Sequence, residues 1–188
     1  MKTKISIVFF VLAVLLVVGT LRNDIFGKPK EEVSSQDLLK EFSKKDVFDY
    51  LNQTSFTSYT GQGLDFDKSK IESADIITIH FWASWCAPCV NEVPELIDFV
   101  KRVTTKNSQN LKTVFITVSL DETPEDLNKF LKSFPEFNKE PFVRVWDKDK
   151  SFSKLVNADR LPMTVILNKN IPEPRVVRGV VEWKSINF

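Results

Sequence analysis

Two cysteines separated by two residues directly follow a long apolar run, and this arrangement constrains the fold more than any other feature. Residues 74–82 read ADIITIHFW, which is typical of a strand buried on both faces, and the cysteines stand at positions 86 and 89. From Val90 to Val103 apolar residues recur at helical spacing. The pair therefore lies where a strand ends and a helix begins, the context in which a C-x-x-C motif indicates redox chemistry.

This position gives the two sulfurs different expected roles. Cysteines on the first turn of a helix are close enough to form a disulfide, and Cys86 would lie at the exposed helix N-terminus. Unpaired N–H groups and the helix dipole stabilise a thiolate there, lowering a thiol pKa that is ordinarily about 8.5. We therefore predict that Cys86 attacks and that Cys89, one turn inside, resolves. A structural disulfide is the alternative, but so short a loop would restrict the unfolded chain little.

Composition excludes several other classes of protein. Lys and Arg total 26 against 25 for Asp and Glu, so the sequence has no basic excess and predicts no nucleic-acid partner. A content of 43% hydrophobic and 27% charged residues fits neither a disordered chain nor a multi-pass membrane protein. Two cysteines and one histidine are too few for a zinc site built from these residues alone, and we predict no metal and no other cofactor.

The first 22 residues differ from the rest of the chain. Lys2 and Lys4 precede an uncharged stretch over residues 5–21, which as a helix would reach about 25 Å, the short end of a bilayer span. We predict that residues 1–22 anchor the chain in the cytoplasmic membrane, with the positive tail inside and everything after Arg22 outside. A cleaved secretory signal is the alternative, which would release the chain to the periplasm.

Two further regions follow the anchor. Residues 23–52 read as a polar tether and an amphipathic helix over 36–51 with Ser35 as its cap, and residues 53–188 alternate strands with helices. Strands are predicted at 56–66 (with a turn), 74–82, 111–120, 142–146, 163–167 and 175–181. Helices are predicted after Cys86, from Thr123–Pro124 and over 152–156. This alternation indicates an α/β sheet covered on both faces.

The motif W-A-S-W-C-A-P-C over residues 82–89 resembles the active-site signature of thioredoxin-fold proteins. The chain is similar in particular to the membrane-anchored, extracytoplasmic thiol–disulfide oxidoreductases of the TlpA/ResA type over most of residues 56–183. The similarity extends to E-V-P at 92–94, L-P-x-T at 161–164 and the Gly179 to Trp183 ending. It implies a thioredoxin-like domain over 53–188, with a central mixed sheet flanked by helices, and an enzyme that cycles Cys86 and Cys89 to reduce client disulfides.

The resemblance also implies roles for residues outside the cysteine pair. Glu92 falls on a glutamate that would control proton transfer at Cys89, although a solvated helix residue is the simpler interpretation. Pro162 falls on a cis-proline facing the disulfide, and a plain strand-start proline is its alternative. A cis bond would expose the backbone of Leu161 for pairing with a client peptide. The expected client-binding residues are Trp85, Ala87, Pro88 and Leu161.

His80 departs from the pattern of the family. It stands six residues before Cys86, where thioredoxins carry a buried aspartate and the ResA type often an asparagine. One interpretation is a hydrogen-bonded core residue. The other is a proton relay beneath Cys89, a task that suits a side chain with an ordinary pKa near 6.5.

The C-terminus departs as well, because the family continues past the last strand into a helix and here only residues 184–188 remain. We expect the helix over 36–51 to cover the face that this helix would cover. The alternative is an apolar patch that a partner covers.

For partners, the resemblance implies client proteins with cysteine pairs and a membrane thiol donor. The clients it suggests are periplasmic apocytochrome c or copper-site cysteines of respiratory enzymes. A disulfide-forming oxidase and a non-catalytic binding module of the same fold are the alternative functions. No basic residue lies between the two cysteines, and we take this to favour the reducing direction.

Overall fold

The computed structural model describes residues 42–64, 67–105 and 111–186. The predicted anchor, the tether and the first part of the 36–51 helix lie outside the described residues. None of the helices in these ranges has the length and hydropathy of a transmembrane span.

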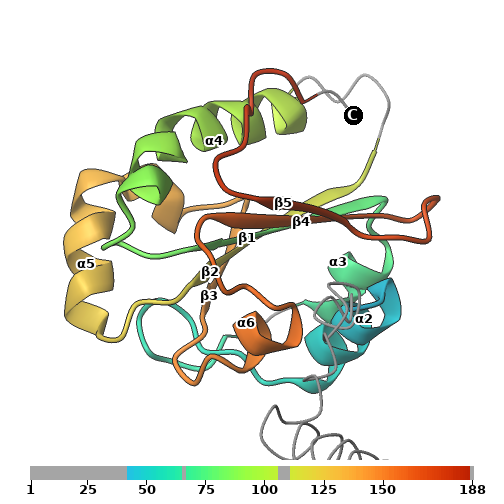
Figure 1. Ribbon diagram of the computed structural model, residues 1–188, viewed down its shortest axis with the longest axis horizontal. Helices are drawn as coiled ribbons and strands as arrows, with labels where there is room; N and C mark the ends of the chain where they lie inside the picture. Colours follow the sequence, from blue (N-terminus) through green and yellow to red (C-terminus); the bar gives the residue numbers. More distant parts are fainter. Residues whose placement is uncertain (1–41, 65–66, 106–110, 187–188) are drawn as a thin grey trace, which may run out of the picture. The chain divides into compact units, whose positions relative to one another are not determined.

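Five strands form one mixed sheet in the order β3-β2-β1-β4-β5 (Figure 1). Neighbours β1, β2 and β3 pair in parallel, whereas β4 runs antiparallel to both β1 and β5. All seven residues of β1 are buried, as the continuous apolar run predicts. The predicted mixed sheet is confirmed, with strands at β1 (Ile76–Trp82), β2 (Thr113–Ser119), β3 (Phe142–Trp146), β4 (Met163–Asn168) and β5 (Arg175–Arg178).

Helices cover both faces of this sheet. In Figure 1, α4 lies on one side, and α2, α3 and α6 lie on the other. Helix α5 joins the side of α4, because its Phe130 packs on Trp82 with ring centroids 4.2 Å apart. The helices are α2 (Lys44–Gln53), α3 (Lys68–Glu72), α4 (Ala87–Thr105), α5 (Pro124–Ser133) and α6 (Ser151–Leu155), with a 3₁₀ turn at Pro135–Asn138.

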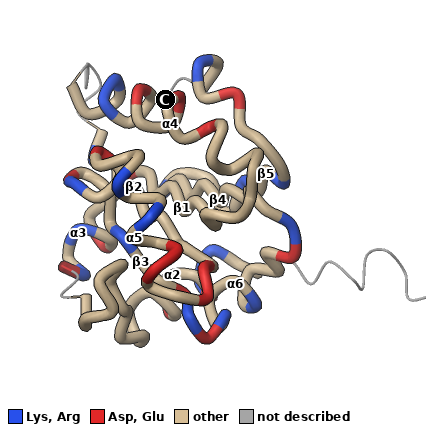
Figure 2. The backbone as a smooth tube through the Cα atoms, turned by 90° about the vertical axis from the view of Figure 1, so that its left-hand side faces the viewer, with Lys and Arg blue, Asp and Glu red and all other residues tan. Residues whose placement is uncertain are grey.

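Most charged residues lie on the helices and loops around the sheet (Figure 2). Figure 2 shows Lys, Arg, Asp and Glu along the helices and loops, while the central strand β1 carries none of them. Aromatic rings fill the two layers between sheet and helices. Phe99 of α4 contacts Phe115 of β2 on one side, and Phe152 of α6 contacts Phe81 of β1 on the other.

Helix α2 starts later than predicted. Residues 42–43 are not helical, and Ser43 caps a helix that begins at Lys44, through a capping box with Asp46. A serine in extended conformation whose side chain accepts from the third helical N–H is a strong start signal, so the helix does not run through it. Thr123 caps α5 in the same way, with Pro124 at its first position, as predicted.

The predicted strand over 56–66 is wrong for its described part. Only an isolated bridge between Thr57 and Gly63 forms there, across a turn in which Gly61 has a φ of 78°. The chain turns back too soon to make a ladder, because glycine adopts this left-handed conformation at little cost.

The last strand is shorter than predicted and ends at Arg178. Gly179, with a φ of 106°, turns the chain out of the sheet, and Val181 then donates its backbone N–H to Glu92 on α4. The segment 181–186 continues along α4, where Arg102 donates to the carbonyl oxygen of Trp183. Contacts with α4 thus replace the strand pairing that was predicted for residues 179–181.

The described part of the 36–51 helix, α2, lies on the side of the sheet opposite α4 (Figure 1). Tyr50 of α2 stacks on Phe152 of α6, with ring centroids 4.7 Å apart, on the opposite side of the sheet. Beside α4 it is the C-terminal segment that buries Val181 and Trp183.

Candidate active site

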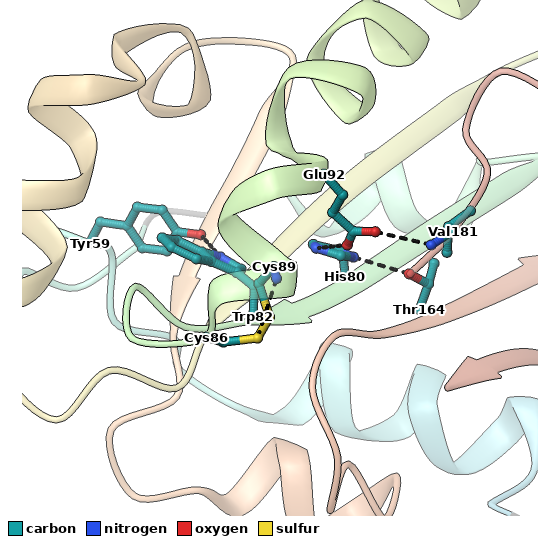
Figure 3. A network of polar contacts seen from close by, with 8 residues as sticks. All are labelled: Tyr59, His80, Trp82, Cys86, Cys89, Glu92, Thr164 and Val181. Atoms are coloured by element: carbon teal, nitrogen blue, oxygen red, sulfur yellow. Dashed lines mark hydrogen bonds and ion pairs between the residues drawn. A yellow bond between two sulfur atoms is a disulfide. The ribbon is translucent and has the colours of Figure 1, made fainter. Parts of the chain in front are cut away.

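The two cysteines form a disulfide at the start of α4, with Cα atoms 5.3 Å apart (Figure 3). The backbone N–H of Cys89 donates to Sγ of Cys86 at 3.3 Å, and Val90 donates to the Cys86 carbonyl oxygen. Cys86 therefore occupies the position of a helix cap, with its sulfur in the place of the usual side-chain oxygen. An amide that donates to this sulfur, together with the helix dipole, favours the thiolate form of Cys86.

The two cysteines differ less in solvent exposure than predicted. Cys86 keeps 6% of its surface and Cys89 none, so Cys86 is the more accessible residue but is not openly exposed in the disulfide form. The neighbouring residues are open instead: Trp85 is 66% exposed, and Ala87 and Pro88 are also exposed. The disulfide itself explains the difference, because Sγ of Cys86 is turned toward Cys89 and lies under this rim.

The cis-proline lies at the same end of the sheet as the disulfide. The Leu161–Pro162 bond is cis, and the register that pairs Phe81 with Met163 sets Pro162 opposite the end of β1. The carbonyl oxygen of Pro162 accepts from Gly179 at 2.8 Å. Within the described ranges, Leu161 makes no backbone hydrogen bond. The backbone group that a client strand would pair with is therefore not used by the fold.

His80 of β1 and Glu92 of α4 meet in the core (Figure 3). Nε2 of His80 lies 3.2 Å from Oε1 of Glu92, and both side chains are 2% exposed. The other ring nitrogen, Nδ1, lies 3.0 Å from Oγ1 of Thr164 on β4. Oε2 of Glu92 accepts the backbone N–H of Val181 at 3.0 Å. The interpretation of Glu92 as a solvated helix residue is wrong, since its side chain reaches across the core to β1.

Burial shifts both of these side chains toward their neutral forms. It raises the pKa of Glu92 to about 7, an effect that the Val181 N–H and the Trp183 indole oppose and the charge of Glu95 assists. Burial alone lowers the pKa of His80 to about 3. The pair is therefore electrically neutral below neutral pH, with a protonated carboxyl beside an uncharged imidazole.

Asp121 ties the loop before the cysteines to the sheet, a role that the sequence analysis missed. This fully buried carboxylate accepts the backbone N–H of Ser84 at 3.0 Å and the Ser84 hydroxyl at 2.7 Å. It also accepts the hydroxyl of Ser119 at 2.7 Å, while its own carbonyl oxygen accepts from Trp146 Nε1. The position of Asp121 could have indicated this role. Asp121 directly follows a buried strand, and the carboxyl ends of parallel strands meet at one edge of a sheet.

Tyr59 performs a similar task from the loop that precedes α3. Its hydroxyl accepts Nε1 of Trp82 at 2.8 Å and donates toward Thr117 Oγ1 at 2.9 Å. Trp82 is a core residue, as predicted, with no exposed surface. This contact fixes the end of β1, from which the cysteine loop starts.

Residues 74–171 match the family described as thioredoxin-like, and this span carries β1 to β4 with both cysteines and the cis-proline. The chain therefore belongs to the thioredoxin-like family.

Within this family the similarity is to thiol–disulfide oxidoreductases, which confirms the resemblance to the TlpA/ResA type. ResA of Bacillus subtilis is 28% identical over 120 residues, which cover 62% of this chain and 60% of ResA. Sporulation thiol-disulfide oxidoreductase A of the same organism is 30% identical over 92 residues, 48% of this chain and 52% of that protein. The match thus spans about half to three fifths of the length of these relatives.

Among solved structures, StoA of Bacillus subtilis superposes with a TM-score of 0.52 at 19% identity, over 70% of this chain and 90% of StoA. This likeness supports the fold independently of the sequence motif.

Proposed function

We propose that this protein is a thiol–disulfide oxidoreductase that reduces disulfides in client proteins. The observation that carries the proposal is the asymmetry of the two sulfurs. Sγ of Cys86 receives an amide hydrogen bond at a helix N-terminus, whereas Cys89 is sealed in the core. One sulfur is prepared to attack and the other to resolve, which a purely structural disulfide does not need.

The reaction proceeds through a mixed disulfide. The Cys86 thiolate attacks one sulfur of the client disulfide, and the other client sulfur leaves with the bonding electron pair and takes a proton. Cys89 then gives its proton to Glu92 and attacks Sγ of Cys86, which releases the first client sulfur as a thiolate that is protonated in turn. The client takes two electrons from the Cys86–Cys89 pair and two protons from solvent, while the Cys89 proton stays on Glu92. A membrane dithiol donor, itself oxidised to a disulfide, restores the reduced pair.

The client binds beside Cys86 in this proposal. Trp85, Ala87 and Pro88 form an exposed rim around the disulfide, and an indole ring offers a large apolar contact at little entropic cost. The backbone of Leu161 pairs with an extended client segment as an added strand would. Selectivity for the cysteine pair comes from Cys86 and Pro162, between which the client disulfide lies.

The proposed place of action is the outer side of a bacterial cytoplasmic membrane, with residues 5–21 in the bilayer, or the periplasm if that segment is cleaved. The clients proposed are apocytochrome c or the copper-site cysteines of a respiratory enzyme. The place of action and the clients follow from the resemblance of the active-site motif to the TlpA/ResA type, and the similar proteins are themselves named only as thiol–disulfide oxidoreductases.

Reduction of insulin by the full chain, with a dithiol supplied, tests the activity. We expect precipitation of the released insulin chains by the natural protein and none by Cys86→Ser. A chain that behaves like its Cys86→Ser variant would instead be a binding module of this fold.

A redox titration against glutathione tests the direction of electron flow. A reduction potential nearer to about −270 mV is expected for a reductase, and one nearer to about −120 mV would identify a disulfide-forming oxidase.

A further inference from the structure

The contact between His80 and Glu92 requires a proton that lies between two buried atoms. Nε2 of His80 and Oε1 of Glu92 are 3.2 Å apart, and neither of these atoms, nor Nε1 of the adjacent Trp183, completes a hydrogen bond with another described residue. Two lone pairs that face each other in the buried core would repel, and each atom would be left without a hydrogen-bond partner. One of the two atoms therefore carries a hydrogen directed at the other.

Thr164 makes either location of that hydrogen possible. Its hydroxyl lies 3.0 Å from Nδ1 of His80, and a hydroxyl can both donate and accept. When Glu92 is protonated, Oε1 donates to Nε2, and Nδ1–H donates to Thr164. When Glu92 is ionised, Nε2–H donates to Oε1, and the Thr164 hydroxyl turns to donate to Nδ1. Every polar atom of the triad is satisfied in both states, and the imidazole is uncharged in both.

We propose that His80 is a positioning residue that changes tautomer when Glu92 gains or loses its proton, while Thr164 reverses its hydrogen bond in step. This inference depends on the proposed function in one respect only, namely that the change of tautomer lets Glu92 exchange a proton with Cys89. Cys89 and Glu92 are three residues apart on α4 and hence lie on one face of the helix.

The charges around the triad are compatible with this exchange. The groups that surround it are Cys89 and Glu95 on α4, Thr117 on β2 (bonded to Tyr59), Thr164 on β4, and Val181 and Trp183 in the C-terminal segment. Glu95 is bonded to Lys184 at 2.8 Å, and in the oxidised protein Cys89 does not titrate. The pKa of about 7 for Glu92 and of about 3 for His80 assign the proton exchanged near neutral pH to the carboxyl.

The exchange with Cys89 balances as a simple proton transfer. During client reduction the Cys89 thiol gives its proton to the Glu92 carboxylate, and the new Oε1–H bond turns toward Nε2. The ring gives up its Nε2 hydrogen and takes one at Nδ1 by exchange with solvent, so its own proton count does not change. When the disulfide is reduced again, the same proton returns to the Cys89 sulfur. No charge is created on the imidazole at any stage, which matters because burial penalises the imidazolium ion.

Nitrogen NMR of the full chain, labelled with ¹⁵N-histidine, tests the proposal directly. The chain contains one histidine, so a protein without an affinity tag gives signals from His80 alone. In the oxidised form we expect the Nδ1–H tautomer below the transition, the Nε2–H tautomer above it, and one step near pH 7. The same tautomer at pH 5.5 and pH 8.5, or a doubly protonated ring at either value, would overturn the proposal.

Two variants complete the test. Glu92→Gln keeps the shape of the side chain but cannot titrate, so the ¹⁵N signals are expected to stay constant with pH. A step that persists in this variant contradicts the assignment to Glu92. In the reduced protein, His80→Asn is expected to move the pH profile of thiol exchange, whereas an unchanged profile would show that His80 does not assist the transfer. The NMR step needs no exchange activity, so its failure and a failure of the proposed function are separate results.

Discussion

The two sulfurs of the disulfide differ, at the scale of single residues, in which backbone groups reach them. Cys86 caps α4 through its sulfur, and Cys89 supplies the amide that the sulfur accepts. Cys89 therefore also has a structural role, because its backbone N–H helps to hold the attacking sulfur of Cys86 in place. Such a division predicts unequal consequences when either residue is replaced.

Cys89→Ser is expected to accumulate a covalent complex with a client, because the mixed disulfide at Cys86 then has no thiol to resolve it. Cys86→Ser is expected to trap nothing and to be inactive, because Cys89 is fully buried. Non-reducing electrophoresis followed by mass spectrometry checks both variants and identifies the client. The natural chain is the control, and trapping that is equal in both variants or confined to Cys86→Ser would reverse the assigned roles.

At the scale of elements, the loop between β1 and α4 is held by its contacts with the next strand end. Asp121 lies just past β2 and receives two hydrogen bonds from Ser84 and one from Ser119. The indole of Trp146 at the end of β3 donates to the carbonyl oxygen of Asp121. Three parallel strand ends thus meet around one residue, Asp121, and these contacts position the cysteine loop.

Removal of that carboxylate by Asp121→Ala is expected to lower the free energy of unfolding by about 2–4 kcal/mol, since it leaves the buried hydroxyl of Ser119 and the partly buried donors of Ser84 unpaired. Ser84→Ala removes a single side-chain bond and is the matched control, with an expected loss of about 1 kcal/mol. Urea denaturation of the oxidised protein measures both changes. Amide hydrogen exchange at Ser84 should become faster in Asp121→Ala, and equal losses in the two variants would contradict the bridging role.

At the scale of the whole molecule, Glu92 connects elements that are far apart in the chain. It projects from α4 to His80 on β1 and to Val181 beyond β5. Its burial makes the stability of the whole protein depend on pH. The folded-state pKa of Glu92 is raised to about 7, so the folded protein holds a proton that the unfolded chain loses near pH 4.5. That stabilisation is complete below about pH 4.5 and is lost as the pH rises through 7.

Glu92→Gln is accordingly expected to gain stability relative to the natural chain between pH 5 and pH 8, by on the order of 2 kcal/mol. Denaturation midpoints of the oxidised proteins at both pH values check the difference. The His80 effect has the opposite sign, because its pKa is lowered to about 3 and its stabilisation is lost as the pH falls below about 6.5. His80→Asn is therefore the control, and the stability of this variant is expected to depend less on pH than that of the natural chain only below about pH 6.5. If the stability of Glu92→Gln and that of the natural chain changed with pH in parallel, the raised pKa of Glu92 would be contradicted.

The local parts of this structure follow from residues that are close in sequence. The apolar run before the cysteines predicts β1, the apolar spacing after them predicts α4, and the Thr123–Pro124 pair predicts the start of α5. These signals act within one or two helical turns, so a sequence contains them fully. Short elements such as α3, which has five residues, carry too few positions for a period to appear and were missed.

The site beyond the cysteines was decided by the tertiary structure. Ser84 meets Asp121 across 37 positions, His80 meets Thr164 across 84, and Val181 meets Glu92 across 89. The sequence identified Glu92 and His80 as candidates but not that they touch, and it overlooked Asp121 altogether. Each polar group is costly to bury alone, so its partner is set by which strand ends and helix faces the packed core brings together. The hydrophobic periodicity of the sequence does not predict these pairs, because the paired residues come together only when the sheet forms.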